Sequence, residues 1–482
     1  MVMVRDDTAR ALAHRLATEQ SERRLPSIAA GLVRDGNQIW FDSAGEVDGV
    51  PPTDETQYRC GSISKTFVAV EVMRLRDEGL VSLSDLIGKH LPEVTELHST
   101  VAQLLSHTSG LRAESAGPWW ERTPGIAFQS LLETSVRSVD VLERPGRRFH
   151  YSNTGYAILG ELVARLRGRP WDEVADEELL RPLGMLRTTT RPVQPHSKGF
   201  GVHPHADVVL SEPEHDALSM APAGQLWTTI GDLCRWSAVL AGLRPEVLSP
   251  QTAAEMREPQ AVNDLPGLPW TTAHGLGLQL FNRGGTRSYG HNGSMPGWLA
   301  ILRIDAGSGP ESGSGSGDAV AILLNATSGL GPTLESDLLS ILASYEPRQP
   351  EAWRPTPGGL TSELLEITGV WYWGTSGFVL SINREGLLDL HALGLGREAA
   401  FRPVGDGSFV GLSGYYTGET LRVVRRPDFS ISHLDIGSFV LTRVPYDPTV
   451  AIPGGVDESG WAGGATERSP RARRRSTPRG KD

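Results

Sequence analysis

A serine and a lysine three residues apart open a strongly apolar stretch of this 482-residue chain. Ser62 begins the sequence SISKTFVAVEVMRLRD, and Lys65 follows three positions later. Residues three apart lie on the same face of a helix, so the Lys65 amine would lie beside the Ser62 hydroxyl. A serine is a weak nucleophile until a base accepts its proton, and burial lowers the pKa of a lysine towards neutrality. The pair therefore predicts a serine nucleophile served by a lysine base.

The same spacing also occurs where a serine caps a helix and a surface lysine follows it. The residues after Lys65 argue against that alternative, because residues 62–77 are apolar on nearly every side of the expected helix. A helix of this kind is buried in the interior of a large domain. We therefore expect Lys65 to be buried.

A second candidate is Tyr151-Ser152-Asn153, within the sequence RFHYSNTGYAILG. The tyrosine could relay a proton through its hydroxyl, and the asparagine could place an amide in the same cleft. Taken alone, the triplet is more often a core tyrosine followed by a turn-forming asparagine. The triplet therefore supports a catalytic role only in combination with the other motifs.

A third candidate is His291-Asn292-Gly293-Ser294, preceded by a glycine and followed by MPGW. Glycines in a strand permit a close approach to the backbone, and the strand N–H groups could form an oxyanion hole. Taken alone, His291 is more often a hydrogen-bonded structural histidine. A separate pair of histidines, His203 and His205, lacks a third ligand, so we expect no metal site there. No cofactor is predicted.

The elements that must position these motifs predict an α+β domain. Helices are expected at residues 9–23, 62–77, 101–105, 155–166 and 229–240. Apolar strand runs come before and after this helical middle, at residues 28–34, 38–41, 298–304 and 319–324. The strands at the two ends are expected to meet in one sheet. Residues 307–318 are rich in Gly and Ser and predict a flexible loop between the last two strands.

The chain is expected to continue into a second, smaller domain. A Pro-rich linker at residues 348–360 separates the first domain, residues 1–347, from short alternating apolar runs in residues 361–447. These runs, at residues 378–382, 387–390, 408–412, 420–424 and 438–441, are typical of a small all-β barrel or sandwich. Residues 448–482 are predicted to be a disordered basic tail.

Composition and charge exclude several classes of function. The net charge is −11, and residues 468–482 contribute +6, which leaves −17 for the rest. An acidic body argues against a nucleic-acid partner. Two cysteines, Cys60 and Cys234, do not make a disulfide framework. No apolar run of about 18 residues and no secretory signal are visible, so we expect no membrane span and a cytoplasmic location.

Together and in this order, the three motifs resemble those of the serine β-lactamase and penicillin-binding-protein superfamily, closest to its class C and esterase branch. Ser62 and Lys65 match Ser-x-x-Lys, Tyr151 and Asn153 match Tyr-x-Asn, and His291 and Gly293 match the third motif in its His-x-Gly form. Residues 105–111, LSHTSGL, and 222–228, PAGQLWT, are similar to further strings of the superfamily. The resemblance covers about residues 7–345 and implies a β-lactamase-like first domain.

The resemblance also implies roles for the backbone and for Tyr151. The N–H groups of Ser62 and Ser294 would form the oxyanion hole, and Lys65 or Tyr151 would be the base in acylation. Tyr151, with its pKa lowered by the neighbouring Lys65, would activate the second nucleophile. Asn153 would orient the substrate amide and Lys65.

Further residues are expected to bind substrate, and one departure from the family matters. Asn292, Gly293 and Trp298 are expected to line the substrate site. His291 stands where the family has a lysine that holds a substrate carboxylate. A histidine is mostly neutral at pH 7, which favours a substrate without a free carboxylate, such as an ester or thioester.

Three functions from different classes remain open. The first resembles the penicillin-binding-protein-type thioesterases, stand-alone cyclases of nonribosomal peptides with a lipocalin-like C-terminal barrel. This resemblance implies a peptidyl carrier protein as a partner, a D-configured residue at the attacked carbonyl, and Arg443 of the barrel as a residue that places substrate. The second is an esterase or D-amino-acid amidase with water as acceptor; a β-lactamase is less favoured. The third is a non-catalytic binding module.

Overall fold

The computed structural model describes residues 3–137, 140–283, 286–307, 317–349, 352–355 and 361–445. The chain divides into two compact units, Met1–Gln349 and Pro350–Asp482. The predictions for residues 448–482, and for most of the loop at residues 307–318, lie outside the described residues. The described part of the expected linker, residues 348–349 and 352–355, has no helix or strand.

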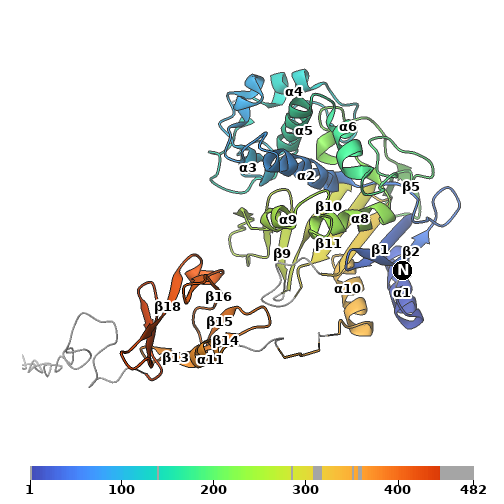
Figure 1. The fold of residues 1–482 in the computed structure, drawn as a ribbon. Helices are drawn as coiled ribbons and strands as arrows, with labels where there is room; N and C mark the ends of the chain where they lie inside the picture. The colour runs from blue at the N-terminus through green and yellow to red at the C-terminus, as the bar shows by residue number, and fades with distance from the viewer. Residues whose placement is uncertain are drawn as a thin grey trace, which may run out of the picture. The chain divides into compact units, whose positions relative to one another are not determined.

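The first unit is built on one eight-stranded sheet with the strand order β2-β1-β12-β11-β10-β9-β8-β7 (Figure 1). Its strands are β1 (Ser27–Arg34), β2 (Asn37–Gly45), β7 (Ala261–Val262), β8 (Thr272–His274), β9 (Gln279–Arg283), β10 (Thr286–Met295), β11 (Trp298–Asp305) and β12 (Ala319–Leu324). The N-terminal strand β1 pairs antiparallel with β12. The predicted closure of one sheet by strands from both ends of the domain is therefore confirmed.

Both faces of this sheet are buried, because apolar residues alternate between two cores. In β1, Ile28 and Leu32 belong to the core under the helices α1 (Asp6–Arg23) and α10 (Leu334–Tyr345). Ala29 of the same strand belongs to the larger core on the opposite face, which includes residues of α8 (Ile230–Leu240). The period of two residues is what a strand requires when it is covered on both sides.

The other helices of the unit lie on the same side of the sheet as α8, opposite α1 and α10 (Figure 1). Its helices are α2 (Ser64–Asp77), α3 (Val101–Leu105), α4 (Phe128–Ser135), α5 (Asn153–Arg167), α6 (Trp171–Ala175), α7 (Ala221–Gly224) and α9 (Pro250–Met256). Short 3-10 and π segments are η1 (Gly61–Ile63), η2 (Ile87–Lys89), η3 (Pro92–Val94) and η5 (Asp176–Leu180). Two small sheets pair β3 (Tyr58–Arg59) with β6 (Trp227–Thr228) and β4 (Phe200–Val202) with β5 (Val209–Ser211).

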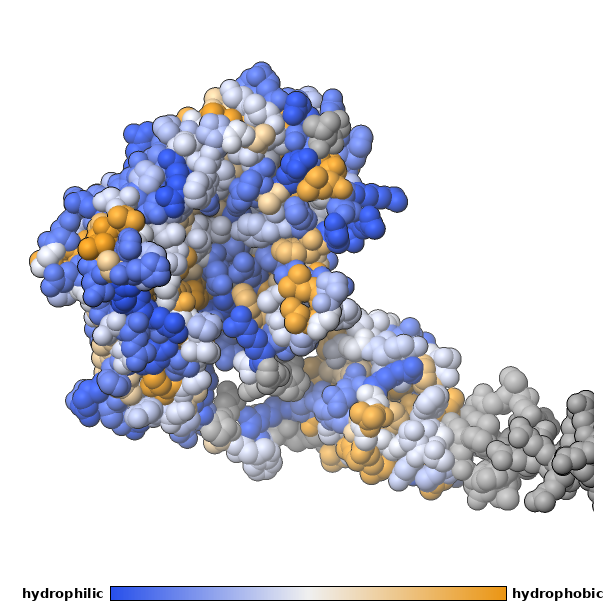
Figure 2. Space-filling view, turned by 180° about the vertical axis from the view of Figure 1, so that it is seen from behind, coloured by the Kyte–Doolittle hydropathy of each residue, from blue (hydrophilic) through white to orange (hydrophobic). Residues whose placement is uncertain are grey.

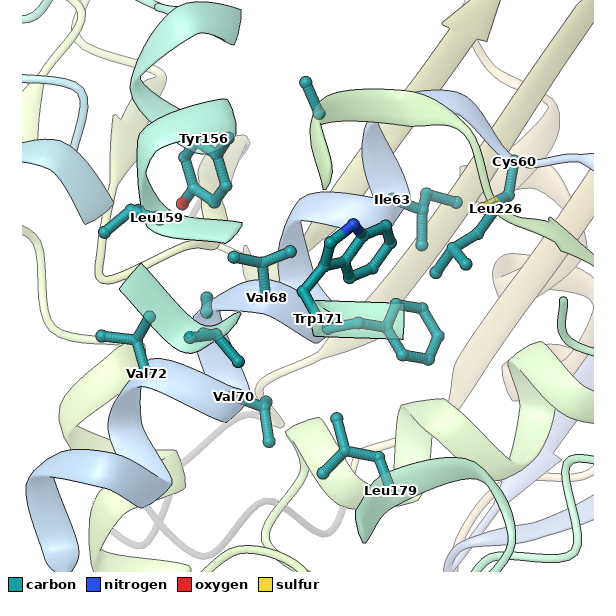
Figure 3. Packing of buried hydrophobic residues seen from close by; sticks show 14 of the residues in the cluster. Cys60, Ile63, Val68, Val70, Val72, Tyr156, Leu159, Trp171, Leu179 and Leu226 are labelled. Carbon is teal, nitrogen blue, oxygen red and sulfur yellow. The ribbon is translucent and has the colours of Figure 1, made fainter. Parts of the chain in front are cut away.

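Helix α2 is enclosed on all sides, as its sequence predicts. Figure 3 shows Val68 and Val72 of α2 near Tyr156 and Leu159 of α5. The helix differs from the prediction only at its start, because residues 61–63 form a 3-10 turn and the α-helix begins at Ser64. The deep burial of this helix determines the electrostatics of Lys65, described below.

The second unit is an eight-stranded antiparallel barrel in which neighbouring strands follow one another along the chain. After the helix α11 (Ser362–Ile367), its strands are β13 (Gly369–Trp373), β14 (Ser376–Ile382), β15 (Leu388–Ala392), β16 (Ala399–Pro403), β17 (Ser408–Gly411), β18 (Thr420–Arg425), β19 (Ile431–Ile436) and β20 (Phe439–Leu441). Backbone hydrogen bonds of 2.7 and 2.8 Å between Tyr372 and Thr442 join its two ends, which makes the barrel nearly closed and lipocalin-like.

On the face that Figure 2 shows, hydrophobic residues form separate patches among hydrophilic ones. Of the helices described, none combines the length and the apolarity that crossing a membrane requires.

Candidate active site

Ser62 and Lys65 are in direct contact at the start of α2. The Lys65 Nζ lies 2.9 Å from the Ser62 Oγ and donates a second hydrogen bond, of 2.5 Å, to the carbonyl oxygen of Ala223 in α7. The Lys65 side chain is fully buried. These two contacts hold the amine in one place against the serine hydroxyl.

Burial lowers the pKa of Lys65 to about 7. The effect is opposed by the negative fields of Glu114 and Glu121, which raise it. A large fraction of Lys65 is therefore neutral near pH 7, and a neutral amine has the lone pair that can accept the Ser62 proton. The predicted shift of the Lys65 pKa towards neutrality is confirmed.

Tyr151 is positioned by a histidine that the sequence motifs did not assign. The ring of His107 stacks on the Tyr151 ring with centroids 4.1 Å apart. The His107 Nδ1 accepts the N–H of Ser152, and its carbonyl oxygen accepts the N–H of His150, at 3.1 and 2.8 Å. His107 thus accepts hydrogen bonds from the backbone on both sides of Tyr151. The Lys65 Nζ lies 5.0 Å from the centroid of the Tyr151 ring.

The expectation that the Tyr151 pKa is lowered is wrong. Burial is the largest influence and raises the pKa of Tyr151 well above its ordinary value, and the fields of Glu114 and Glu121 raise it further. The polar influence of Ser62 lowers the pKa only in part. Tyr151 is thus a protonated hydroxyl, and this hydroxyl is buried and has no hydrogen-bond partner among the described residues.

Asn153 is bonded to a carboxylate rather than to Lys65. Its Nδ2 donates to the Glu114 Oε1 at 2.7 Å, and the other oxygen of Glu114 accepts the indole N–H of Trp120, also at 2.7 Å. The Asn153 side chain is 7% exposed, and its Oδ1 has no hydrogen-bond partner among the described residues. The amide therefore presents an acceptor to its surroundings.

The start of α2 and the strand β10 approach each other very closely. A Cβ built on Gly61 would lie 2.4 Å from the backbone nitrogen of Ser294, and one built on Gly293 would lie 1.9 Å from the carbonyl oxygen of Cys60. Gly61 also has a φ of 52°, which other residues rarely adopt. The two glycines bring the Ser62 turn and the Ser294 backbone together, as a shared oxyanion hole requires.

His291 is neutral and lies beside this pair of segments. It is 1% exposed, and burial together with the field of Lys65 lowers its pKa well below the ordinary value. Its Nδ1 lies 2.5 Å from the carbonyl oxygen of Asn292, so Nδ1 carries the proton and Nε2 carries a lone pair. The Nε2 is buried without a partner in the part of the chain that the structure describes.

Asn292 and Trp298, which were expected to bind substrate, have other partners. The Asn292 Oδ1 accepts a hydrogen bond of 2.7 Å from Arg303 of β11. Trp298 is fully buried and donates its indole N–H to Ser197 at 3.0 Å.

Arg443 is held within its own domain. Its guanidinium donates to the carbonyl oxygens of Thr368 (2.8 Å), Val370 (3.3 Å) and Glu366. It also lies 3.8 Å from the centroid of the Trp371 ring.

His107, Glu114 and Ala223 are site residues that the sequence motifs did not assign. Two of them had a signal, because His107 lies in the string LSHTSGL and Ala223 in PAGQLWT. Glu114 follows the first string by three residues and had no signal of its own. Among the described residues, no group of three His, Cys, Asp or Glu side chains is arranged to hold a metal ion. Cys60 and Cys234 are both free and buried.

Comparison with known families identifies the first unit. Residues 8–337 match the family model described as beta-lactamase, and residues 360–443 match a domain of unknown function, DUF7586. Penicillin-binding protein 4 of Amycolatopsis lactamdurans is 29% identical over 384 residues, which cover 73% of this chain and 94% of that protein. Two other relatives are matched over 49% and 55% of their own lengths.

Solved structures extend the likeness to both units. The crystal structure of SurE is similar with a TM-score of 0.57 and 25% identity, over 91% of this chain and 99% of SurE. The D-amino acid amidase of Ochrobactrum anthropi SV3, complexed with D-phenylalanine, has a TM-score of 0.58 and 23% identity, over 70% of this chain and 98% of the amidase. By the match of most of its length and by its Ser62–Lys65 site, the chain belongs to the β-lactamase family and is an enzyme of the serine hydrolase and acyltransferase type.

Proposed function

We propose that this enzyme transfers an acyl group without a free carboxylate from a thioester to Ser62, and then to an amine of the same peptide, which releases a macrocycle. The observation that carries the proposal is the uncharged third motif. His291 is buried and neutral where a carboxylate-binding cation is expected. A β-lactam or a peptide with a terminal carboxylate would find no permanent positive charge at this position, whereas a thioester needs none.

The first step is acylation of Ser62. Neutral Lys65 takes the hydroxyl proton while the oxygen attacks the thioester carbonyl, and the backbone N–H groups of Ser62 and Ser294 stabilise the tetrahedral oxyanion. The C–S bond then breaks, and the thiolate receives the proton from Lys65 or Tyr151. The protonated state of Tyr151 suits it to donate a proton at this stage.

The second step is deacylation by an amine. The neutral amine of the peptide attacks the ester carbonyl, the C–O bond to Ser62 breaks, and the amine proton returns through Lys65 to the Ser62 oxygen. Water in place of the amine would give the linear acid. The two outcomes use the same catalytic groups, so the acceptor decides between cyclase and hydrolase.

The comparisons support this choice of substrate in two ways. SurE, whose match covers 91% of this chain, has also been solved with D-Leu. A D-amino acid amidase complexed with D-phenylalanine matches 70% of this chain. A D-configured residue at the attacked carbonyl is therefore part of the proposal. A peptidyl carrier protein is the proposed source of the thioester.

The second candidate is a D-amino-acid amidase or esterase that uses water. The likeness to the Ochrobactrum amidase over 70% of this chain favours it. In that case the catalytic steps are the same, and the leaving group is ammonia or an alcohol.

A model thioester separates the two candidates. Purified enzyme would be incubated with an N-acetylcysteamine thioester of a free-amine peptide ending in a D-residue, with its L-epimer alongside. A product one water lighter than the linear acid, formed from the D-substrate, is the expected result. Linear acid alone would favour the hydrolase, and the absence of turnover of either epimer would contradict both forms of the proposal.

A further inference from the structure

Besides the protonated Tyr151 hydroxyl, the site has two unpartnered polar atoms among the described residues, and both are acceptors. The Nδ2 of Asn153 must face Glu114, because a carboxylate can only accept hydrogen bonds. This fixes the orientation of the amide and leaves its Oδ1 as a buried acceptor without a partner among the described residues. A side chain that is 93% buried rarely leaves such an atom unpaired unless a ligand or water completes it.

His291 adds an acceptor of the same kind. Because its Nδ1 proton is directed to a backbone carbonyl, its buried Nε2 has only a lone pair to offer. The rings of His291 and Tyr151 have centroids 6.2 Å apart. Thus neither the Asn153 side-chain amide nor the His291 imidazole has a free donor for a substrate carbonyl.

Glu114 adds a negative charge that only neutral groups contact. It accepts hydrogen bonds from the Asn153 amide and the Trp120 indole, and within the described ranges no ion pair involves it. Glu114 is otherwise exposed. Its partner Asn153 begins α5 two residues after Tyr151, and the Tyr151 ring centroid lies 5.0 Å from the Lys65 Nζ. The field of Glu114 raises the pKa of both Lys65 and Tyr151. A second carboxylate, Glu121, acts on the same two groups and accepts the indole N–H of Trp119 at 2.9 Å.

We propose that Glu114 and Asn153 form a subsite beside Ser62 that binds a primary ammonium group of the substrate. An ammonium has three donors and a positive charge, which match the Asn153 Oδ1 and the carboxylate. This inference rests on the proposed function, acyl transfer at Ser62. It goes beyond that proposal by stating which group of the substrate the enzyme recognises.

The ammonium could come from the α-carbon of the acyl donor or from the amine that accepts the acyl group. An acceptor amine must lose its proton before it attacks a carbonyl, and Lys65 is the base that could take this proton, whereas the α-amine of a donor keeps its proton throughout. Competition between free-amine and N-acetylated donors distinguishes the two.

Binding without turnover is the first test. Isothermal titration calorimetry of the Ser62→Ala variant at pH 7 would compare D-phenylalaninol, which has an ammonium, with N-acetyl-D-phenylalaninol, which does not. We expect the free amine to bind about tenfold more tightly or better, and Glu114→Gln in addition to reduce this preference to about twofold. Glu133→Gln, on the exposed side of α4, is the matched control and should leave the preference unchanged.

Any of three results would overturn the proposal. They are equal affinity for the two ligands, no binding of either ligand up to about 10 mM, and an unchanged preference after Glu114→Gln. These outcomes do not depend on acyl transfer. Failure of Ser62 to be acylated by any thioester would contradict the proposed function and would leave the calorimetric result to decide the subsite.

The source of the amine follows from kinetics of the unmodified enzyme. If the subsite binds the donor's amine, the D-phenylalanyl thioester should exceed its N-acetyl form by about tenfold in kcat/KM, and Glu114→Gln should reduce that ratio. If it binds the acceptor, the ratio should be near one, and added glycinamide should divert the acyl-enzyme to amide with saturation that Glu114→Gln abolishes. Neither behaviour in an enzyme that does form the acyl-enzyme would overturn the subsite.

Discussion

Gly293 lies against the carbonyl oxygen of Cys60 so closely that a Cβ on residue 293 would be 1.9 Å from it. The contact joins β10 to the turn that carries Ser62. It explains why this position needs glycine: the neighbour is backbone and not a ligand. The spacing between the Ser62 and Ser294 N–H groups therefore depends on the absence of one side-chain atom.

Gly293→Ala should separate these two segments and weaken the oxyanion hole. We expect a loss of about 10²- to 10³-fold in the rate of Ser62 acylation, the effect typical of losing one oxyanion donor. Gly201→Ala is a suitable control, because a Cβ there would meet its nearest atoms at 3.6 and 3.9 Å. Full activity of Gly293→Ala, measured with a chromogenic ester, would show that the close contact does not position the oxyanion hole.

The rate of acylation should rise with pH through about pH 7. Lys65, with its pKa lowered to about 7 by burial, is a base only after it loses its proton. Below pH 7 the rate should fall about tenfold per pH unit, and above pH 8 it should be level. The burial of His291 and Tyr151 moves their pKa values away from this window, downward and upward respectively. A profile of kcat/KM that stays level down to pH 5 would contradict Lys65 as the base.

Lys65→Met should abolish acyl transfer and stabilise the fold. In the interval between the folded pKa of about 7 and the unfolded value of 10.5, the unfolded chain binds more protons than the folded one. The free energy of unfolding of the wild type therefore rises with pH across that window. The destabilisation caused by burying Lys65 is largest at and below pH 7. Methionine has no such cost, so we expect a gain of about 1–4 kcal/mol at pH 7 that shrinks towards pH 10. Thermal unfolding at both pH values is the measurement, and a lower Tm of the variant at pH 7 would contradict this account.

Arg443→Ala should destabilise the C-terminal barrel. The variant loses hydrogen bonds to three backbone carbonyls and the contact with the Trp371 ring, which together should cost about 2–4 kcal/mol. Calorimetry of the full chain should show the loss in the transition of the barrel. If unfolding is unchanged while the KM for a peptidyl thioester rises, Arg443 serves the substrate rather than the barrel.

Local patterns predicted the fold to the extent that a single segment determines it. The all-round apolar stretch after Ser62 predicted a buried helix, and the apolar runs at the two ends of the first domain predicted one sheet. In the barrel, β13, β16 and β19 were not predicted. Strand β16 ends at Pro403, which weakens its pattern, and pairing with neighbouring strands forms it. Strand β13, with the sequence GVWYW, is rich in strand-forming residues but too short and too poorly alternating to stand out by itself.

The electrostatics of the site could not be predicted, since they arise from residues distant in the sequence. The Tyr151 pKa depends on carboxylates at 114 and 121 and on burial between separate elements. The placement of Asn292 could have been anticipated, because residues 291 and 292 of one strand point to opposite faces. The sheet register then brings Asn292 to Arg303.

The most direct test of the central claim is the mass of the intact protein after exposure to a D-configured peptidyl thioester, for the wild type and for Ser62→Ala. The account predicts that the wild type gains the mass of the acyl group minus one hydrogen, located by peptide mapping on Ser62, and that the variant gains nothing. An adduct that persists in Ser62→Ala, or that maps to a different residue, would contradict the assignment of Ser62 as the nucleophile.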